Sequence, residues 1–212
     1  MKKNLLIASS LVLFTGSVFL NGCKKDDTTA PVITISSDNP STVILGGTYS
    51  DAGATATDAE DGTVTVSSSG TVDTHTAGTY TITYSASDKA GNNQTASRTV
   101  YVTIERSNYI MSFNADDSCT TNVTIGAFTW SGAIAAGGAA NAIVFSGFSG
   151  TGASCTATVN GSVITIPSQT VGAFTNVNGN GTMNSTGTKI TLDYSATMTG
   201  TTESYHAVLT KL

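Results

Sequence analysis

The sequence predicts an all-β protein with two domains in series. Charged residues make up only 11% of the 212-residue chain, and 22 residues are glycine. Thr, Ser and Val are abundant, whereas the helix-forming Leu, Glu, Lys and Arg are scarce. β-branched residues fit pleated strands and glycine fits tight turns. No segment after residue 23 shows a sustained 3.6-residue repeat, so we expect almost no helix.

Residues 1–22 have the pattern of an export signal. Two lysines at positions 2 and 3 precede an uncharged apolar run over residues 5–20. The alternative is an anchor helix that stays in the protein, since a run of this length nearly crosses a bilayer. The run ends in Leu-Asn-Gly-Cys at residues 20–23, which resembles the lipobox of bacterial lipoproteins and departs from it only at Asn21. The resemblance implies that Cys23 receives a diacylglycerol and becomes the first residue of the mature protein.

Residues 23–30 are expected to form the acylated tether, because this stretch is short and charged and carries no large apolar side chain. Its Lys-Lys-Asp-Asp run at residues 24–27 resembles the acidic export signal that follows the acylated cysteine in surface lipoproteins of Bacteroidetes. That resemblance implies a protein held in the outer membrane by its lipid anchor and facing the cell exterior. The alternative is a solvated spacer on a lipoprotein that faces the periplasm.

Residues 31–105 are predicted to form a β-sandwich of short strands separated by turns. The clearest strand is Thr79–Ala86, in which apolar and hydroxyl side chains alternate. The other strands are expected at Val32–Ile35, Thr42–Leu45, Thr63–Val66 and Ser97–Ile104. Strands of this kind cannot bury their apolar faces singly, so they are expected to pack as two sheets.

Several phrases in this region recur in the same order and spacing in one known family. They are Thr-Thr-Ala-Pro-Val-Ile at 28–33, Thr-Asp-Ala-Glu-Asp-Gly at 57–62, Val-Asp-Thr at 72–74, Gly-Thr-Tyr-Thr-Ile-Thr-Tyr at 78–84 and Ser-Asp-Lys-Ala-Gly-Asn at 87–92. Together they resemble the bacterial immunoglobulin-like domains of surface proteins, of the DUF5011 type. The resemblance implies a spacer or adhesion module without catalysis and does not specify a ligand.

Acidic residues gather in the predicted loops of this first domain. Because Ca²⁺ prefers carboxylate and carbonyl oxygens that converge from loops, a calcium site at one end of the sandwich is one expectation. Its candidate ligands are Asp58, Glu60, Asp61 and Asp88. Residues 58–62 lack the ligand spacing of an EF-hand loop. Acidic turns without a metal are therefore the alternative.

Residues 106–212 are expected to form a small antiparallel β-barrel or curled sandwich. Asn160-Gly161 predicts a hairpin between Cys155–Val159 and Ser162–Ile166. Alternating residues at Lys189–Ala196 and Ser204–Thr210 predict a second hairpin around Gly200. The other strands are expected at Tyr109–Phe113, Asn122–Trp130, Ala142–Phe148, Ala153–Val159, Gln169–Phe174 and Gly181–Met183. Eight or nine up-and-down strands favour closure, because closure removes exposed edges.

The layout of this second domain distantly resembles the lipocalin-like β domains that end many lipoproteins of Bacteroidetes. Such a barrel would imply a cavity, although strand number and shear decide whether side chains fill the interior. Two cysteines, Cys119 and Cys155, lie in this domain. In an exported protein they could form a disulfide, or they could be two separate buried thiols.

Catalytic and nucleic-acid-binding patterns are missing from the sequence. The two histidines, His75 and His206, fall in different predicted domains, and the adjacent Asp116 and Asp117 would point to opposite faces of a strand. Residues 147–151 lack the glycine pattern of a nucleophile elbow. The net charge of −5 leaves no basic patch for phosphates. We therefore expect no enzyme, no nucleic-acid partner and no cofactor other than calcium.

Aromatic residues give the one indication of ligand binding. Most of them are expected in the core of the second domain. Trp130 precedes a glycine-containing, loop-like run and is the candidate for contact with a glycan or another ligand. The leading function is adhesion or ligand presentation at the cell surface, with a glycan or protein as partner. A carbohydrate-binding accessory lipoprotein and a lipocalin-like carrier of an apolar small molecule are the alternatives.

Overall fold

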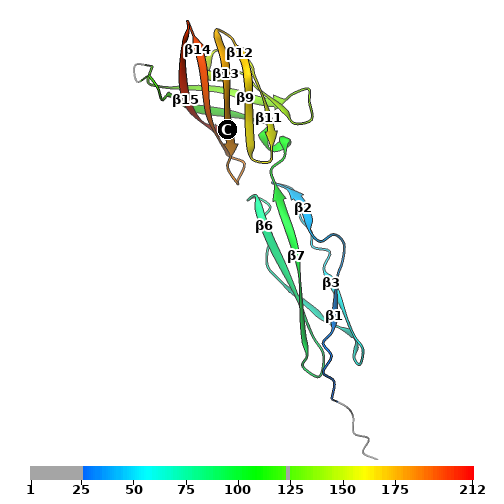
Figure 1. Ribbon diagram of the computed structural model, residues 1–212. Helices are drawn as coiled ribbons and strands as arrows, with labels where there is room; N and C mark the ends of the chain where they lie inside the picture. Colours follow the sequence, from blue (N-terminus) through cyan, green and yellow to red (C-terminus); the bar gives the residue numbers. More distant parts are fainter. Residues whose placement is uncertain (1–25, 123–124) are drawn as a thin grey trace, which may run out of the picture.

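The computed structural model describes residues 26–122 and 125–212 and confirms the all-β prediction. Figure 1 shows two β domains end to end, with the N-terminal tether at the end of the first domain that faces away from the second. The described ranges contain two short 3₁₀ turns, η1 (Arg106–Tyr109) and η2 (Phe148–Gly150), and no α-helix. Within these ranges, no helix has the length and hydropathy that a bilayer span requires.

The first domain is a sandwich of two sheets. One sheet has the order β1-β3-β4 and the other the order β2-β7-β6-β5. The strands are β1 (Val32–Ile35), β2 (Ser41–Ile44), β3 (Ala54–Asp58), β4 (Gly62–Val64), β5 (Val66–Ser69), β6 (Gly78–Ser87) and β7 (Asn93–Thr103). The β2–β7 pair is parallel, whereas the other pairs in this domain are antiparallel.

Two features of this sandwich differ from the prediction. The single strand expected at Thr63–Val66 is divided at Thr65 into β4 and β5, which belong to different sheets. The chain crosses from one sheet to the other at this point. Strand β3 was not predicted, because its small residues give only weak alternation. In the structure its Ala56 and Asp58 face inward and are buried.

A buried arginine connects the two sheets of the first domain. The apolar cluster here contains only three buried residues, Ile82, Tyr84 and Val100. Arg98 of β7 is 2% exposed beside them. Its guanidinium donates to the carbonyl oxygens of Ser36 and Gly53, which flank β1 and β3 in the opposite sheet.

The same guanidinium is neutralised at the edge of the cluster. Nε of Arg98 donates to the hydroxyl oxygen of Tyr84 at 3.1 Å and lies 3.2 Å from Oδ1 of Asp51. The Tyr84 hydroxyl donates in turn to Oδ1 of Asp51 at 2.6 Å. Charge and hydrogen bonds therefore hold the two sheets together where apolar area is small.

The second domain is a closed barrel of eight antiparallel strands in sequential order, with β15 returning to pair with β8. The strands are β8 (Met111–Cys119), β9 (Ala127–Ala136), β10 (Ala142–Phe145), β11 (Cys155–Asn160), β12 (Val163–Val171), β13 (Phe174–Met183), β14 (Lys189–Met198) and β15 (Thr201–Lys211). The predicted hairpin at Asn160-Gly161 is present, with Asn160 paired to Val163 and Gly161 in the turn at a φ of 56°.

Several strands of the barrel differ in their bounds from the prediction. The strands expected at Tyr109–Phe113 and Asn122–Trp130 are β8 and β9, which both begin and end later. The segment expected at Ser162–Ile166 continues to Val171 in the single strand β12, which carries irregular pairing near Gln169, and the expected Gln169–Phe174 runs across the turn into β13. Strand β13 starts well before the expected Gly181–Met183. Its Asn, Gly and Thr residues give little apolar alternation. Neighbouring strands on both sides supply its hydrogen bonds, and this tertiary context overrides weak local preference.

The two domains share a continuous core at their junction. Leu45, Val102 and Ile104 of the first domain belong to the same cluster of buried residues as the barrel interior. The side-chain amide of Asn108 donates to the carbonyl oxygen of Leu45 at 2.9 Å. Tyr109 of η1 is fully buried, and its hydroxyl donates to the carbonyl oxygen of Gly161 at 2.8 Å. The junction is therefore packed rather than a free linker.

Candidate functional site

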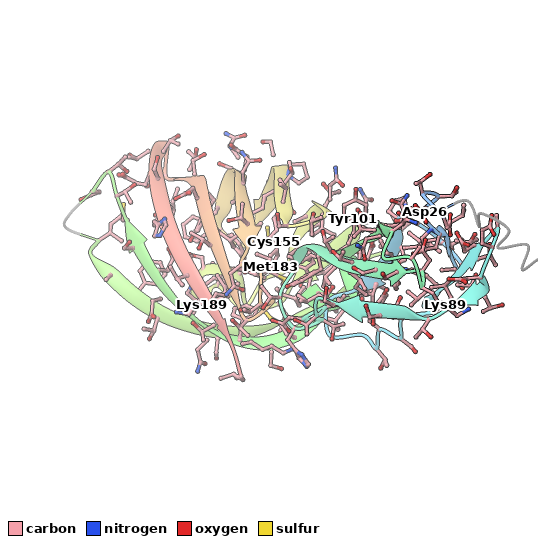
Figure 2. All side chains as sticks on the ribbon, turned by 90° about the horizontal axis from the view of Figure 1, so that it is seen from below. Asp26, Lys89, Tyr101, Cys155, Met183 and Lys189 are labelled. Carbon is pink, nitrogen blue, oxygen red and sulfur yellow. The ribbon has the colours of Figure 1, made fainter. Side chains whose placement is uncertain are left out.

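A cluster of three carboxylates lies at the end of the first domain where residues 26–30 enter it. Asp58 ends β3, Asp88 follows β6, and Asp27 belongs to the tether. Each of the three offers a carboxylate oxygen within 4.8 Å of the other two. Figure 2 shows their sequence neighbours Asp26 and Lys89 at the end of this domain that lies away from the barrel.

Asp58 has one carboxylate oxygen bonded and the other without a partner. Its Oδ1 accepts hydrogen bonds from the backbone N–H groups of Glu60, at 2.8 Å, and Asp61, at 3.0 Å. Its Oδ2 is buried and has no hydrogen-bond partner. Asp58 as a whole is 8% exposed. A buried carboxylate oxygen without a donor is unfavourable, so this atom marks the cluster as a candidate site.

Asp88 is held by a single neighbouring residue. Its Oδ1 accepts the backbone N–H of Asn92 and its Oδ2 accepts the side-chain amide of Asn92, both at 2.8 Å. The same amide donates to the carbonyl oxygens of Asp27, at 3.2 Å, and Thr29, at 3.3 Å. Asn92 therefore places the tether backbone directly beside the carboxylates.

The structure brings together two of the four residues that the sequence suggested as calcium ligands. Asp58 and Asp88 are members of the cluster. Asp61 instead lies 3.0 Å from Nζ of Lys89 and accepts the Lys89 backbone N–H. Glu60 is exposed and is not part of the group.

Sequence reasoning missed Asp27 and Asn92. Asp27 was assigned to the tether and its export-signal-like run, and it is far from Asp58 and Asp88 in the sequence. Asn92 ends the family-like phrase at residues 87–92, in which only Asp88 was considered as a ligand. That phrase was the available signal, since an Asp and an Asn four residues apart in one turn can share hydrogen bonds.

Trp130, the predicted ligand contact, points into the barrel and is 6% exposed. The prediction of exposure is wrong because the glycine-containing run after it continues β9 as far as Ala136 instead of forming a loop. The indole N–H donates to Oδ2 of Asp117 at 3.1 Å, and the Tyr194 hydroxyl donates to the same oxygen at 2.5 Å. Trp130 is a core residue with a buried hydrogen-bond acceptor.

Asp117 is the buried acid of the barrel, at 2% exposure, and its Oδ1 has no hydrogen-bond partner. Burial raises the pKa of Asp117, and the hydrogen bonds from Tyr194 and Trp130 oppose that shift without cancelling it. Its neighbour Asp116 is exposed on the outer face. This confirms that the two adjacent acids do not form a pair.

Aromatic rings pack against one another inside the barrel. Phe148 of η2 lies with its ring centroid 4.9 Å from that of Tyr194 and 5.6 Å from that of Trp130. Phe113 contacts Trp130 edge to face at 5.2 Å and Phe145 at 6.4 Å. The side chains of these five residues therefore occupy the part of the barrel interior around Phe148, as is common in small barrels.

Cys119 and Cys155 are two free, buried thiols, and the disulfide considered from sequence is not formed. Cys119 ends β8 and Cys155 begins β11, so β9 and β10 lie between them in the barrel. Adjacent strands are about 4.8 Å apart, whereas a disulfide needs Cα atoms within about 7 Å. Burial raises the pKa of the Cys155 thiol to about 12, which leaves it unreactive.

The two histidines, which the sequence did not predict as site residues, lie apart from the carboxylate cluster and from Asp117. His75 is exposed beside Asp73, and His206 on the outer barrel face lies 2.7 Å from Oδ1 of Asp193. Cys23, the predicted lipidation site, lies outside the described residues.

Comparisons with known proteins assign the first domain. Residues 33–102 match the family model described as bacterial surface protein, Ig-like domain. Among solved structures, the lipoprotein BT2262 from Bacteroides thetaiotaomicron is similar over 85% of this chain and 100% of its own, with 18% identity and a TM-score of 0.37. The comparison with curated proteins gives no match. The N-terminal region is therefore Ig-like, and this match fits a cell-surface protein.

Proposed function

We propose that this chain is a non-enzymatic lipoprotein of the outer membrane that presents its barrel at the cell surface for adhesion or ligand binding. The observation that carries the proposal is the arrangement in Figure 1, where the tether and the barrel lie at opposite ends of the Ig-like domain. The lipobox-like residues 20–23 support an anchor on Cys23. The family match at residues 33–102 supports a location on the surface.

The junction between the domains supports a role for the Ig-like domain as a spacer. The shared core around Leu45 and Ile104 and the hydrogen bond from Asn108 to Leu45 hold the barrel in one orientation on that domain. A packed junction keeps the barrel away from the tether, whereas a flexible linker would let it fold back. The DUF5011 type of the spacer and the lipocalin-like origin of the barrel are part of this proposal.

Adhesion or ligand presentation is preferred over the two alternatives. The carbohydrate-binding alternative was motivated by an exposed Trp130, which is buried. The carrier alternative needs an open apolar interior, and the packed rings around Phe148 disfavour one. The partner in this proposal is a glycan or a protein that contacts the outer surface of the barrel.

The experiment is protease treatment of intact cells that express the full chain. The expected result is digestion of the barrel on intact cells, with the Cys23→Ala variant lost from the membrane fraction. The matched control is Cys119→Ala, which removes a thiol and keeps the anchor. A barrel that resists the protease until the outer membrane is permeabilised would contradict surface display. Mature protein without acyl chains in a mass spectrum would contradict the anchor.

A further inference from the structure

We propose that a calcium ion binds between Asp27, Asp58 and Asp88 and fixes the tether onto the Ig-like domain. This site lies at the end of the domain where residues 26–30 enter it, far from the barrel (Figure 2). The inference goes beyond the surface role proposed above and does not depend on it. It concerns how residues 26–31 are held against the Ig-like domain, whatever the barrel binds.

The separation of the three carboxylates suits a single ion. Each offers an oxygen within 4.8 Å of the others. Calcium binds oxygens at about 2.3–2.6 Å, so two ligands on opposite sides of one ion are about 5 Å apart. One ion can therefore contact all three residues without moving β3, which carries Asp58, or the turn after β6, which carries Asp88.

The charge at this site has no counterion among the described residues. None of the three carboxylates forms an ion pair within that part of the chain, and the nearby Lys89 is paired with Asp61. Two of the three, Asp58 and Asp88, are buried. Buried like charges at this distance repel one another, and a divalent cation would reverse that repulsion.

The oxygen Oδ2 of Asp58 is the second, independent indication of a ligand. Its partner oxygen Oδ1 is taken by the two backbone donors of the turn, which leaves Oδ2 for the cluster. A buried oxygen without a donor is rare in folded proteins, and a bound ion is one explanation for it. Asp58 is thus the residue on which binding depends most.

Enough oxygen ligands are present for calcium. A carboxylate has about four lone-pair sites, so Asp88 and Asp27 keep acceptor capacity after their hydrogen bonds to Asn92 and Thr29. Calcium takes 6–8 oxygens in flexible geometry, and water would complete the shell. Magnesium demands near-ideal octahedral geometry at about 2.0–2.1 Å, which three separate chain segments are poorly suited to supply.

The consequence of binding is an ordered tether. Asp27 contributes from outside the sandwich, four residues after Cys23, while the other two ligands belong to the domain. The hydrogen bonds from Asn92 to the carbonyls of Asp27 and Thr29 already place the tether there. An ion shared by all three carboxylates would hold this segment against the domain.

The test is calorimetric titration of Ca²⁺ into the full chain in detergent. We expect one ion per chain with a Kd of about 10⁻⁴–10⁻³ M, the range of extracellular calcium modules. Asp58→Asn should weaken binding at least about tenfold, because it removes a ligand charge. The matched control is Glu60→Gln, which removes an exposed charge in the same turn and should change the Kd by less than about twofold.

Asp27→Asn is the second variant, because it changes a residue of the tether and leaves the strands of the sandwich intact. It should weaken calcium binding and also abolish calcium protection of residues 26–31 against limited proteolysis. No binding at 10 mM Ca²⁺, about ten times the upper expected Kd, would overturn the site. Wild-type affinity in both aspartate variants would overturn it as well. Binding that leaves proteolysis of the tether unchanged would overturn the tether's role. Protease treatment of intact cells tests surface display separately, so the two proposals can fail independently.

Discussion

The two domains are both built from strands, yet different interactions hold them together. The Ig-like domain has a cluster of three buried apolar residues and connects its sheets through the buried Arg98. The barrel has a much larger cluster, which includes the packed rings around Phe148. A small sandwich with little apolar area relies on polar connections, whereas a barrel can rely on packing alone.

The same difference appears at the edges of the sheets. The barrel closes on itself, because β15 pairs with β8. The Ig-like sandwich keeps edges at β1, β2, β4 and β5, and each of these strands is only three or four residues long. Short edge strands limit unwanted pairing with other chains. They also contribute few backbone hydrogen bonds. Side chains such as Asn92 and Asp58 therefore supply hydrogen bonds that hold the loops at the end of this domain.

The largest expected effect is in the barrel. Phe148→Ala should lower the free energy of unfolding by about 4 kcal/mol, because it removes a fully buried ring from the aromatic cluster. Urea unfolding followed by Trp130 fluorescence measures this, since Trp130 is the single tryptophan of the chain. The control is Met198→Ala at an exposed position, with an expected change below about 0.5 kcal/mol. A loss under about 1 kcal/mol in Phe148→Ala would mean that packing does not dominate the barrel.

The next effect is in the Ig-like domain. Arg98→Ala should lower the free energy of unfolding of this domain by about 3 kcal/mol, because it leaves the carbonyls of Ser36 and Gly53 without this donor and Asp51 without its ion-pair partner. Circular dichroism should report an earlier transition for this domain, while the Trp130 fluorescence transition moves less. Equal shifts in both signals would show that the two domains unfold as one unit.

A smaller effect concerns the buried acid of the barrel. Burial raises the pKa of Asp117 above its ordinary value of 3.8, so the folded barrel favours the protonated form. The free energy of unfolding is then greatest at pH values below the ordinary pKa of 3.8. It falls as the pH rises through the pKa of the folded state. Asp117→Asn should remove this fall and raise the free energy of unfolding at pH 7, because it removes the charge whose burial is unfavourable. Melting temperatures of the wild type and the variant across pH 4–8 measure it. Lower stability of the Asp117→Asn variant at pH 7 would show that the charged form is preferred.

The smallest effect is at the junction. Asn108→Ala removes the hydrogen bond from its amide to Leu45 and should weaken the coupling between domains by about 1 kcal/mol. Limited proteolysis at residues 105–108 should become faster, while the unfolding midpoints of both domains change little. Unchanged cleavage would mean that the apolar contacts of Leu45 and Ile104 suffice to hold the junction.

Much of the fold follows from local sequence. The alternation at residues 79–86, 189–196 and 204–210 predicts β6, β14 and β15, and the Asn-Gly pair predicts the β11–β12 hairpin. Strand β3 was missed and little more than the last three residues of β13 was predicted, because small and polar residues form strands only when neighbours supply their hydrogen bonds. A local pattern carries no information about such neighbours.

The candidate site was predictable only in part. Asp58 and Asp88 were expected in loops that a sandwich brings to one end, so their type and position suggested calcium; in the structure Asp58 ends β3 and Asp88 follows β6. Asp27 could not be predicted as a ligand, because the local sequence carries no information about which loop of the domain the tether contacts. Trp130 was misplaced for a similar reason: its burial depends on Asp117 and Tyr194, which are distant in sequence.

Hydrogen exchange of the full chain, with and without Ca²⁺, tests the contrast between the domains most directly. We predict that the amides of β14 and β15 exchange much more slowly than those of β6 and β7 and do not respond to the ion. Calcium should slow exchange in residues 26–31, 58–61 and 88–92. Equal protection in the two domains, or slowing by calcium throughout the barrel, would contradict this account.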